Sequence, residues 1–153
     1  MDVFEAIATT RAMRRLDPDR DVSDADVLTI IEAATKAATG GNRQPVRWLV
    51  VRDAGKRRQL GDIYRECWAA ARKVYATGGD NPVVRSADHL GEHLGEAPVL
   101  ILPCSRGDAG QMASSVFPGV QNLFLAARAL GLGTTLTTVH RLREPEVRAV
   151  LDV

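Results

Sequence analysis

The chain has 153 residues, of which 45% are hydrophobic and 25% charged, and this composition is typical of one globular domain with a real core. The net charge of +1 gives no indication of a nucleic-acid or membrane partner, and no apolar run reaches the roughly 18 residues of a transmembrane helix. Asp2 and Glu5 stand where a secretory signal needs basic residues, so we expect a cytoplasmic protein.

The first half of the chain is predicted to contain three helices and a strand. Residues 2–9 form a short amphipathic helix. A second helix starts at the capping pair Ser23 and Asp26 and runs to about Ala38, because apolar residues recur on one face. Val46–Val51 has the β-rich composition of a strand, and residues 55–75 again have helical spacing.

The second half begins with a loop over residues 77–82 and a weak polar helix or ordered loop over 83–95. Residues 97–104 are a continuous apolar run, which predicts a strand buried on both faces. Residues 111–130 have the longest helical pattern and are apolar nearly all round. Within it, Pro118 marks a kink or the true start, and Gly131 ends it. A β-branched strand is predicted over residues 134–138, and a short terminal helix after Pro145.

The stretch Thr9–Leu16 carries three arginines, Arg11, Arg14 and Arg15, within five residues. A guanidinium group stays charged at any working pH and presents a fork of donors that fits a phosphate group. The spacing therefore raises the hypothesis of a phosphate site. The alternative is a solvated basic patch that pairs with the acidic residues from Asp17 to Asp21.

Residues 39–45, Thr-Gly-Gly-Asn-Arg-Gln-Pro, stop the second helix. On one interpretation they are only a glycine C-cap. On the other, the amides of Asn42 and Gln44 read the edge of a flat heterocycle, because each amide offers both donors and an acceptor.

Two other patterns carry little functional weight. His89-Leu-Gly-Glu-His93 matches a short zinc-protease pattern, but Gly91 weakens the helix it needs and no third ligand follows, so we expect no metal site. Gly131-Leu-Gly133 lacks the third glycine of a dinucleotide fingerprint and precedes a strand rather than following one.

Taken together, four segments resemble the nitroreductase family of flavoenzymes. Thr10–Leu16 is similar to that family's phosphate motif, and Thr39–Val46 to its amide-bearing loop. Phe117–Gly133 is similar to its central dimer helix and following glycine turn, and Glu96-Ala97-Pro98 to the entry of a buried strand. Ala12 replaces a common serine. The family usually continues with another strand and a tail beyond the position of Val153, so we expect this chain to lack that C-terminal segment.

The resemblance implies an α+β fold in which helices flank a central mixed or antiparallel sheet, in a single domain over residues 1–153. It also implies a homodimer with flavin mononucleotide (FMN) at the subunit interface and with the helix at about 111–130 in that interface. An all-round apolar helix suits such an interface. By resemblance, the residues that contact FMN are Arg11, Ala12, Met13, Arg14, Arg15, Thr39, Gly40, Gly41, Asn42, Gln44, Leu136, Thr137 and Thr138.

The activity implied is an FMN-dependent oxidoreductase that takes hydride from NAD(P)H and passes it, in a ping-pong scheme, to a small oxidised acceptor such as a nitroaromatic or a quinone. The flavin carries the chemistry, so no side chain is assigned as catalytic. The alternative is a homologue that binds or stores flavin without turnover. A third reading is a structural dimer without the cofactor.

Overall fold

The computed structural model describes residues 1–75, 81–107 and 109–153, which fold into two compact units. The first unit comprises Met1–Ala12, Asp21–Val50 and Ile101–Thr134, and the second comprises Met13–Arg20, Val51–Leu100 and Thr135–Val153. None of the described helices combines the length and the hydropathy needed to cross a bilayer.

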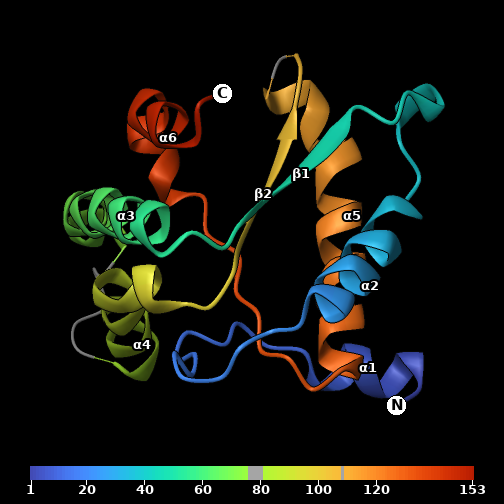
Figure 1. Cartoon of the computed structure of the whole chain (residues 1–153), viewed down its shortest axis with the longest axis horizontal. Helices are drawn as coiled ribbons and strands as arrows, with labels where there is room; N and C mark the ends of the chain where they lie inside the picture. Colours follow the sequence, from blue (N-terminus) through green and yellow to red (C-terminus); the bar gives the residue numbers. More distant parts are fainter. Residues whose placement is uncertain (76–80, 108) are drawn as a thin grey trace. The chain divides into compact units, whose positions relative to one another are not determined.

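The first unit packs helices beside a small antiparallel sheet (Figure 1). Its elements are α1 (Val3–Thr9), α2 (Asp24–Thr35), a 3-10 turn (Gly40–Asn42), β1 (Val46–Val51), β2 (Leu100–Ser105) and α5 (Ala109–Ala129). The predicted capping pair is confirmed, since Ser23 Oγ accepts from the Asp26 backbone N–H at 3.0 Å.

The core of this unit lies where α2 and α5 meet, and it is built from Ile30, Ala34, Leu123 and Ala127. Gly119 permits the close approach, because a Cβ there would lie 3.1 Å from the Ala34 carbonyl oxygen. The apolar face expected on α2 therefore packs against α5.

The second unit is helical, with α3 (Ala54–Tyr75), α4 (Pro82–His93), α6 (Glu144–Leu151) and 3-10 turns at Leu94–Glu96 and Val139–Arg143. A Cβ at Gly61 would lie only 2.8 Å from the Gly95 backbone, so α3 and the turn after α4 touch through glycines. Burial of Cys67 on α3 raises the pKa of its thiol, which marks it as a packing residue.

The main elements agree with the sequence predictions, and two details of these elements differ. The apolar run at 97–104 becomes a strand only from Leu100, and its side chains are half-buried rather than buried on both faces. Pro118 does not mark a helix start, because α5 begins at Ala109. Most of the loop predicted at 77–82 lies outside the described residues.

The predicted strand over residues 134–138 is wrong. Only Thr134 makes a β-bridge, and the rest of the segment pairs with no strand in the described part of the chain. The α+β class is confirmed, with its sheet limited to β1 and β2.

Candidate functional site

The arginine segment, residues 11–15, leaves the end of α1 and meets the threonine segment, residues 134–138. Ala12 and Thr134 form an isolated parallel β-bridge in the first unit. Two segments more than a hundred residues apart in sequence, both predicted from the resemblance to contact FMN, are thus neighbours.

The guanidinium groups of Arg11, Arg14 and Arg15 form no ion pair and no hydrogen bond with any residue that the structure describes. Of the acids that follow, Asp17 instead accepts from the Asp19 backbone N–H at 3.0 Å. The basic patch neutralised by its own neighbouring acids, which the sequence left open, is therefore not what forms.

In the second unit, Tyr64 of α3 fixes the threonine segment. The Thr137 hydroxyl donates to the Tyr64 phenolic oxygen at 3.1 Å, and the Val139 backbone N–H lies 3.4 Å from Thr137 Oγ1. Burial raises the pKa of Tyr64, while the Thr137 hydrogen bond and the charge of Arg14 partly oppose that rise. Arg14 and Thr137 therefore act on the same side chain.

Thr135 carries an orphaned polar atom. Its Oγ1 is buried and has no hydrogen-bond partner among the described residues. An unpaired buried hydroxyl costs stability, so a native structure that keeps one calls for an explanation. A bound group with an acceptor oxygen would supply the missing partner.

The amide loop, residues 39–45, holds an unusual backbone. Gly41, Asn42 and Gln44 have φ of 59°, 51° and 49°. These values lie in the left-handed region, which residues other than glycine rarely adopt. The Gln44 side-chain amide donates to Asn42 Oδ1 at 3.1 Å, and the Gln44 backbone N–H donates to Thr39 Oγ1 at 3.0 Å. Such strain is typical of ligand-binding segments, so the backbone favours the functional interpretation of the loop as a hypothesis.

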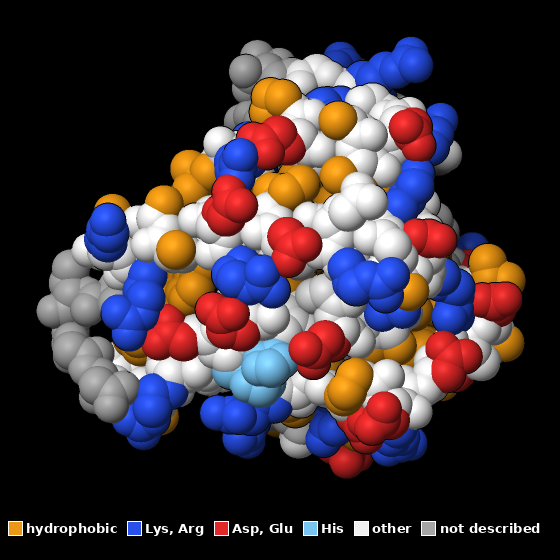
Figure 2. Space-filling view, turned by 60° about the vertical axis from the view of Figure 1, so that its left-hand side comes forward, with side chains coloured by type: hydrophobic (Ala, Val, Ile, Leu, Met, Phe, Trp, Pro, Cys, Tyr) orange, Lys and Arg blue, Asp and Glu red, His pale blue; other side chains and the backbone are white. Residues whose placement is uncertain are grey.

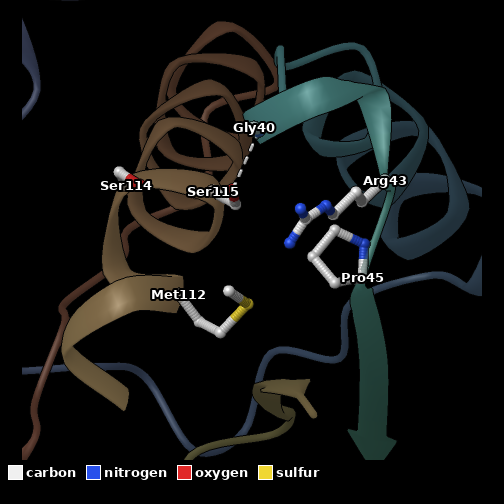
Figure 3. Close-up of a pocket in the computed structure, with 6 residues that line it drawn as sticks. All are labelled: Gly40, Arg43, Pro45, Met112, Ser114 and Ser115. Carbon is white, nitrogen blue, oxygen red and sulfur yellow. Dashed lines mark hydrogen bonds between the residues drawn. The ribbon is translucent and has the colours of Figure 1, made fainter. Parts of the chain in front are cut away.

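A pocket of about 270 Å³ lies beside this loop, between it and α5 (Figure 3). The guanidinium of Arg43 extends into the pocket, and Ser115 Oγ accepts from the Gly40 backbone N–H at 3.1 Å. The sequence analysis assigned no role to Arg43, Ser115, Tyr64 or Thr135. Only Arg43 carried a signal there, as a cation between two amides.

The predicted site residues thus fall into two groups. Ala12 meets Thr134, and Arg14 and Thr137 share Tyr64. Within the first unit, no described hydrogen bond joins the amide loop to Arg11 or Ala12. As contacts of FMN, all the predicted residues stay a prediction: Arg11, Ala12, Met13, Arg14, Arg15, Thr39, Gly40, Gly41, Asn42, Gln44, Leu136, Thr137 and Thr138.

The histidines of α4 have a structural setting. The rings of His89 and His93 stack with their centroids 4.3 Å apart, and His93 Nδ1 lies 3.0 Å from Glu96 Oε1. Burial, then the charges of His93 and Arg15, lower the pKa of His89. The described residues include no group of three or more side chains that could hold a metal ion.

A family model described as "Nitroreductase family" matches residues 7–153. The chain belongs to the nitroreductase family. The match confirms the resemblance that the sequence indicated and spans the arginine segment and the amide loop, and the α+β architecture agrees with it.

Relatives within the family differ in what they do. The chain is 32% identical over 151 residues to 5,6-dimethylbenzimidazole synthase of Rhodospirillum rubrum, with 91% of this chain and 68% of the relative covered. It is 28% identical to iodotyrosine deiodinase of Thermotoga neapolitana, covering 94% of this chain and 77% of the relative. Among solved structures, a protein of Desulfovibrio desulfuricans in complex with FMN has a TM-score of 0.71 and 27% identity, covering 100% of this chain and 77% of that one.

Proposed function

We propose that this nitroreductase-family protein is an FMN-dependent oxidoreductase that uses NAD(P)H and works as a homodimer. When bound, FMN supplies hydride transfer from NAD(P)H to a small oxidised acceptor such as a nitroaromatic or a quinone, in a ping-pong scheme. The observation that carries the proposal is the arginine segment, whose three guanidinium groups have no carboxylate partner in the described part of the chain.

The residues of the two neighbouring segments fit the phosphate end of FMN. A phosphate offers several acceptor oxygens, and the arginine segment offers only donors. The Thr135 hydroxyl, orphaned among the described residues, gains an acceptor if phosphate or a ribityl hydroxyl lies beside it. Tyr64 then acts as a positioning residue, because it anchors the threonine segment through Thr137.

The amide loop is proposed to serve the ring end of the cofactor, across the subunit boundary for Thr39, Gly40 and Gly41. The mutual hydrogen bond of Asn42 and Gln44 orients both amides, so each keeps further donors or acceptors for a flat heterocycle. The chain's own role is to bind and orient. Protons can come from water, so we assign no side chain to proton transfer.

The homodimer is supported by apolar side chains that α1 leaves exposed. Phe4 is 79% exposed and Ile7 55%. A hydrogen bond from Arg128 Nε of α5 to Thr9 Oγ1 of α1, at 2.9 Å, joins the two helices. On α5, Phe117 is 44% exposed. Exposed aromatic and aliphatic groups on adjoining helices are typical of an interface.

The dimer can be tested by sedimentation of Phe4→Asp, which we expect to shift the protein to monomer. Val83→Asp is the matched control: Val83 is 66% exposed at the start of α4, where an acidic residue suits the helix dipole. A wild-type monomer at all concentrations, or equal effects of both variants, would contradict the dimer proposal.

The function is tested by mixing purified protein with FMN, removing free cofactor and recording the visible spectrum. We expect retained absorbance near roughly 450 nm, the band of oxidised flavin. Anaerobic NADH or NADPH should then bleach it, and a nitroaromatic or quinone should restore it. Retention of FMN without bleaching would indicate the flavin-storing alternative. Failure to retain any flavin would reject the proposal for this chain.

A further inference from the structure

Two side chains that line the pocket beside the amide loop, Arg43 and Ser115, keep hydrogen-bond donors unused. Arg43 forms no ion pair, and its guanidinium makes no hydrogen bond to any described residue. Ser115 Oγ accepts from the Gly40 backbone N–H, and its own proton makes no hydrogen bond to a described residue. A cation and a hydroxyl with unused donors favour an anion or another strong acceptor.

The neighbouring Arg47, unlike Arg43, forms hydrogen bonds with the backbone of the same region. Its Nη1 donates to the Gln44 and Val46 carbonyl oxygens at 3.2 Å and 3.1 Å. Arg43, four residues earlier, has no such partner and extends into the pocket (Figure 3). The backbone around Arg43 is unusual, because Asn42 and Gln44, which flank it, both have left-handed φ.

The walls of the pocket narrow the ligand class. The thioether of Met112 and the ring of Pro45 face the same space as the guanidinium (Figure 3). The single guanidinium balances one negative charge, which matches a carboxylate better than a phosphate dianion. A volume of about 270 Å³ is at the small end of ligand sites. A carboxylate on a compact apolar body matches these features.

We propose that Arg43 and Ser115 bind the carboxylate of the electron acceptor, so that the preferred acceptors are small nitroaromatics or quinones that carry a carboxylate, with the nitro or quinone group taking the electrons. This proposal rests on the proposed oxidoreductase function and names its substrate class. The carboxylate accepts two hydrogen bonds from the Arg43 guanidinium and one further hydrogen bond from the Ser115 hydroxyl, and Met112 and Pro45 cover the apolar body.

Binding can be measured independently of turnover through Met112. The chain has three methionines, so ¹³C-methyl labelling gives a simple spectrum in which the Met112 methyl reports on the pocket. Titration with benzoate should shift this signal. Benzyl alcohol, a neutral ligand of similar shape, should bind with an affinity at least tenfold lower, as measured by the concentration that gives half of the full shift. Equal affinity for the two ligands would overturn the proposal.

Three variants locate the effect. Arg43→Gln should weaken benzoate binding about tenfold or more and leave benzyl alcohol unchanged, because it removes a charge-assisted pair. Arg43→Lys should restore part of the affinity, since charge remains and the fork is lost. Arg47→Gln, the matched control, should have little effect. Equal losses in Arg43→Gln and Arg47→Gln would indicate a general charge effect and reject the site.

Turnover links the pocket to the reaction. In flavin-loaded protein, 4-nitrobenzoate should have a lower KM than 4-nitrobenzyl alcohol, and Arg43→Gln should remove that preference with flavin retention unchanged. If the wild type retains no flavin but benzoate binding still depends on Arg43, the oxidoreductase proposal fails while the carboxylate site stands. If the flavin is reduced and reoxidised normally but Arg43→Gln changes neither the preference for benzoate in binding nor that for 4-nitrobenzoate in turnover, the carboxylate site is rejected. The oxidoreductase proposal then stands.

Discussion

Four arginines on α3, on α6 and in the 3-10 turn before α6 differ in their partners from the arginines of the arginine segment and the amide loop. The four are paired with carboxylates: Arg65 with Asp62 and Glu92, Arg72 with Asp88, Arg143 with Glu66 and Glu146, and Arg148 with Glu144. Figure 2 shows basic and acidic side chains intermingled on one face of the molecule. Arg11, Arg14, Arg15 and Arg43 have no carboxylate partner in the described part of the chain.

The paired arginines form surface ion pairs, and we propose that these four arginines without a carboxylate partner bind anionic ligands. A net charge of +1 hides this difference, because paired and unpaired cations count alike. Exposed ion pairs each contribute little to stability, about 0.2–1 kcal/mol. Guanidinium groups gathered without acids raise the local positive potential instead, and an incoming phosphate or carboxylate meets no competing carboxylate.

The largest expected effect is the loss of FMN binding when two unpaired guanidinium groups are removed together. Each charge-assisted hydrogen bond is worth roughly 1.5–3 kcal/mol, so Arg11→Gln/Arg14→Gln should weaken FMN binding by about 100-fold or more. Flavin fluorescence during titration measures the affinity. The wild-type affinity should also fall as salt rises, and the variant should show a shallower dependence.

Arg148→Gln is the control for that double variant, because Arg148 is also an arginine but is held by Glu144 Oε1 at 2.8 Å on α6. We expect its FMN affinity to equal the wild type. If the double variant retains wild-type affinity, the arginine segment does not hold the phosphate, and the distinction between paired and unpaired arginines loses its functional meaning.

Thr135→Val replaces the buried unpaired hydroxyl with a methyl group of similar shape. We expect smaller effects, with stability rising and FMN affinity falling. Without FMN, the free energy of unfolding should rise by roughly 1 kcal/mol, because an unsatisfied polar group is removed. FMN affinity should fall by about tenfold, corresponding to roughly 1.4 kcal/mol. Urea denaturation and flavin titration measure the two quantities.

Thr138→Val provides the comparison within the same segment, since Thr138 is exposed. Its stability without FMN should stay within about 0.5 kcal/mol of the wild type. A Thr135→Val protein that is destabilised in the absence of FMN would show that the hydroxyl has a partner, and the argument from its orphaned oxygen would then fail.

Local signals in the sequence were sufficient to predict most of the helices and the first strand. The Ser23 cap, the apolar stripe of α2 and the β-rich Val46–Val51 segment act over one or two turns, and each element forms at or near its predicted bounds. Gly131 ends α5 with φ 78°, and the Leu132 backbone N–H reaches the Ala127 carbonyl oxygen at 2.9 Å. Such features depend on neighbours along the chain and can be read from it.

Features that depend on partners distant in the sequence could not be predicted from the sequence. Residues 134–138 have β-branched side chains, but a strand needs a pairing neighbour, and only Ala12 provides one. The roles of Tyr64 and Thr135 depend on which side chains α3 and the threonine segment bring together, and single residues of these types carry no motif. The family resemblance named the segments of the site. The partners within them come only from the fold.

The smallest expected effect concerns a paired arginine, and it tests the other side of the comparison. Arg72 Nε and Nη2 lie 2.7 Å and 3.0 Å from the two oxygens of Asp88, to which Trp68 Nε1 also donates at 2.9 Å. These groups are half-exposed, so a double-mutant cycle with Arg72→Gln and Asp88→Asn should give a coupling of only about 0.2–1 kcal/mol.

The hydrogen bond from Arg72, then that from Trp68, lowers the pKa of Asp88 below its ordinary 3.8. The unfolded chain therefore binds the Asp88 proton more readily than the folded chain. The coupling should be fully present above about pH 3.8 and should vanish as the pH falls through the lower pKa of the folded state. FMN affinity at neutral pH should be unchanged in both single variants. A loss of flavin binding in Arg72→Gln would show that paired arginines also serve the cofactor, and the separation into two classes would have to be abandoned.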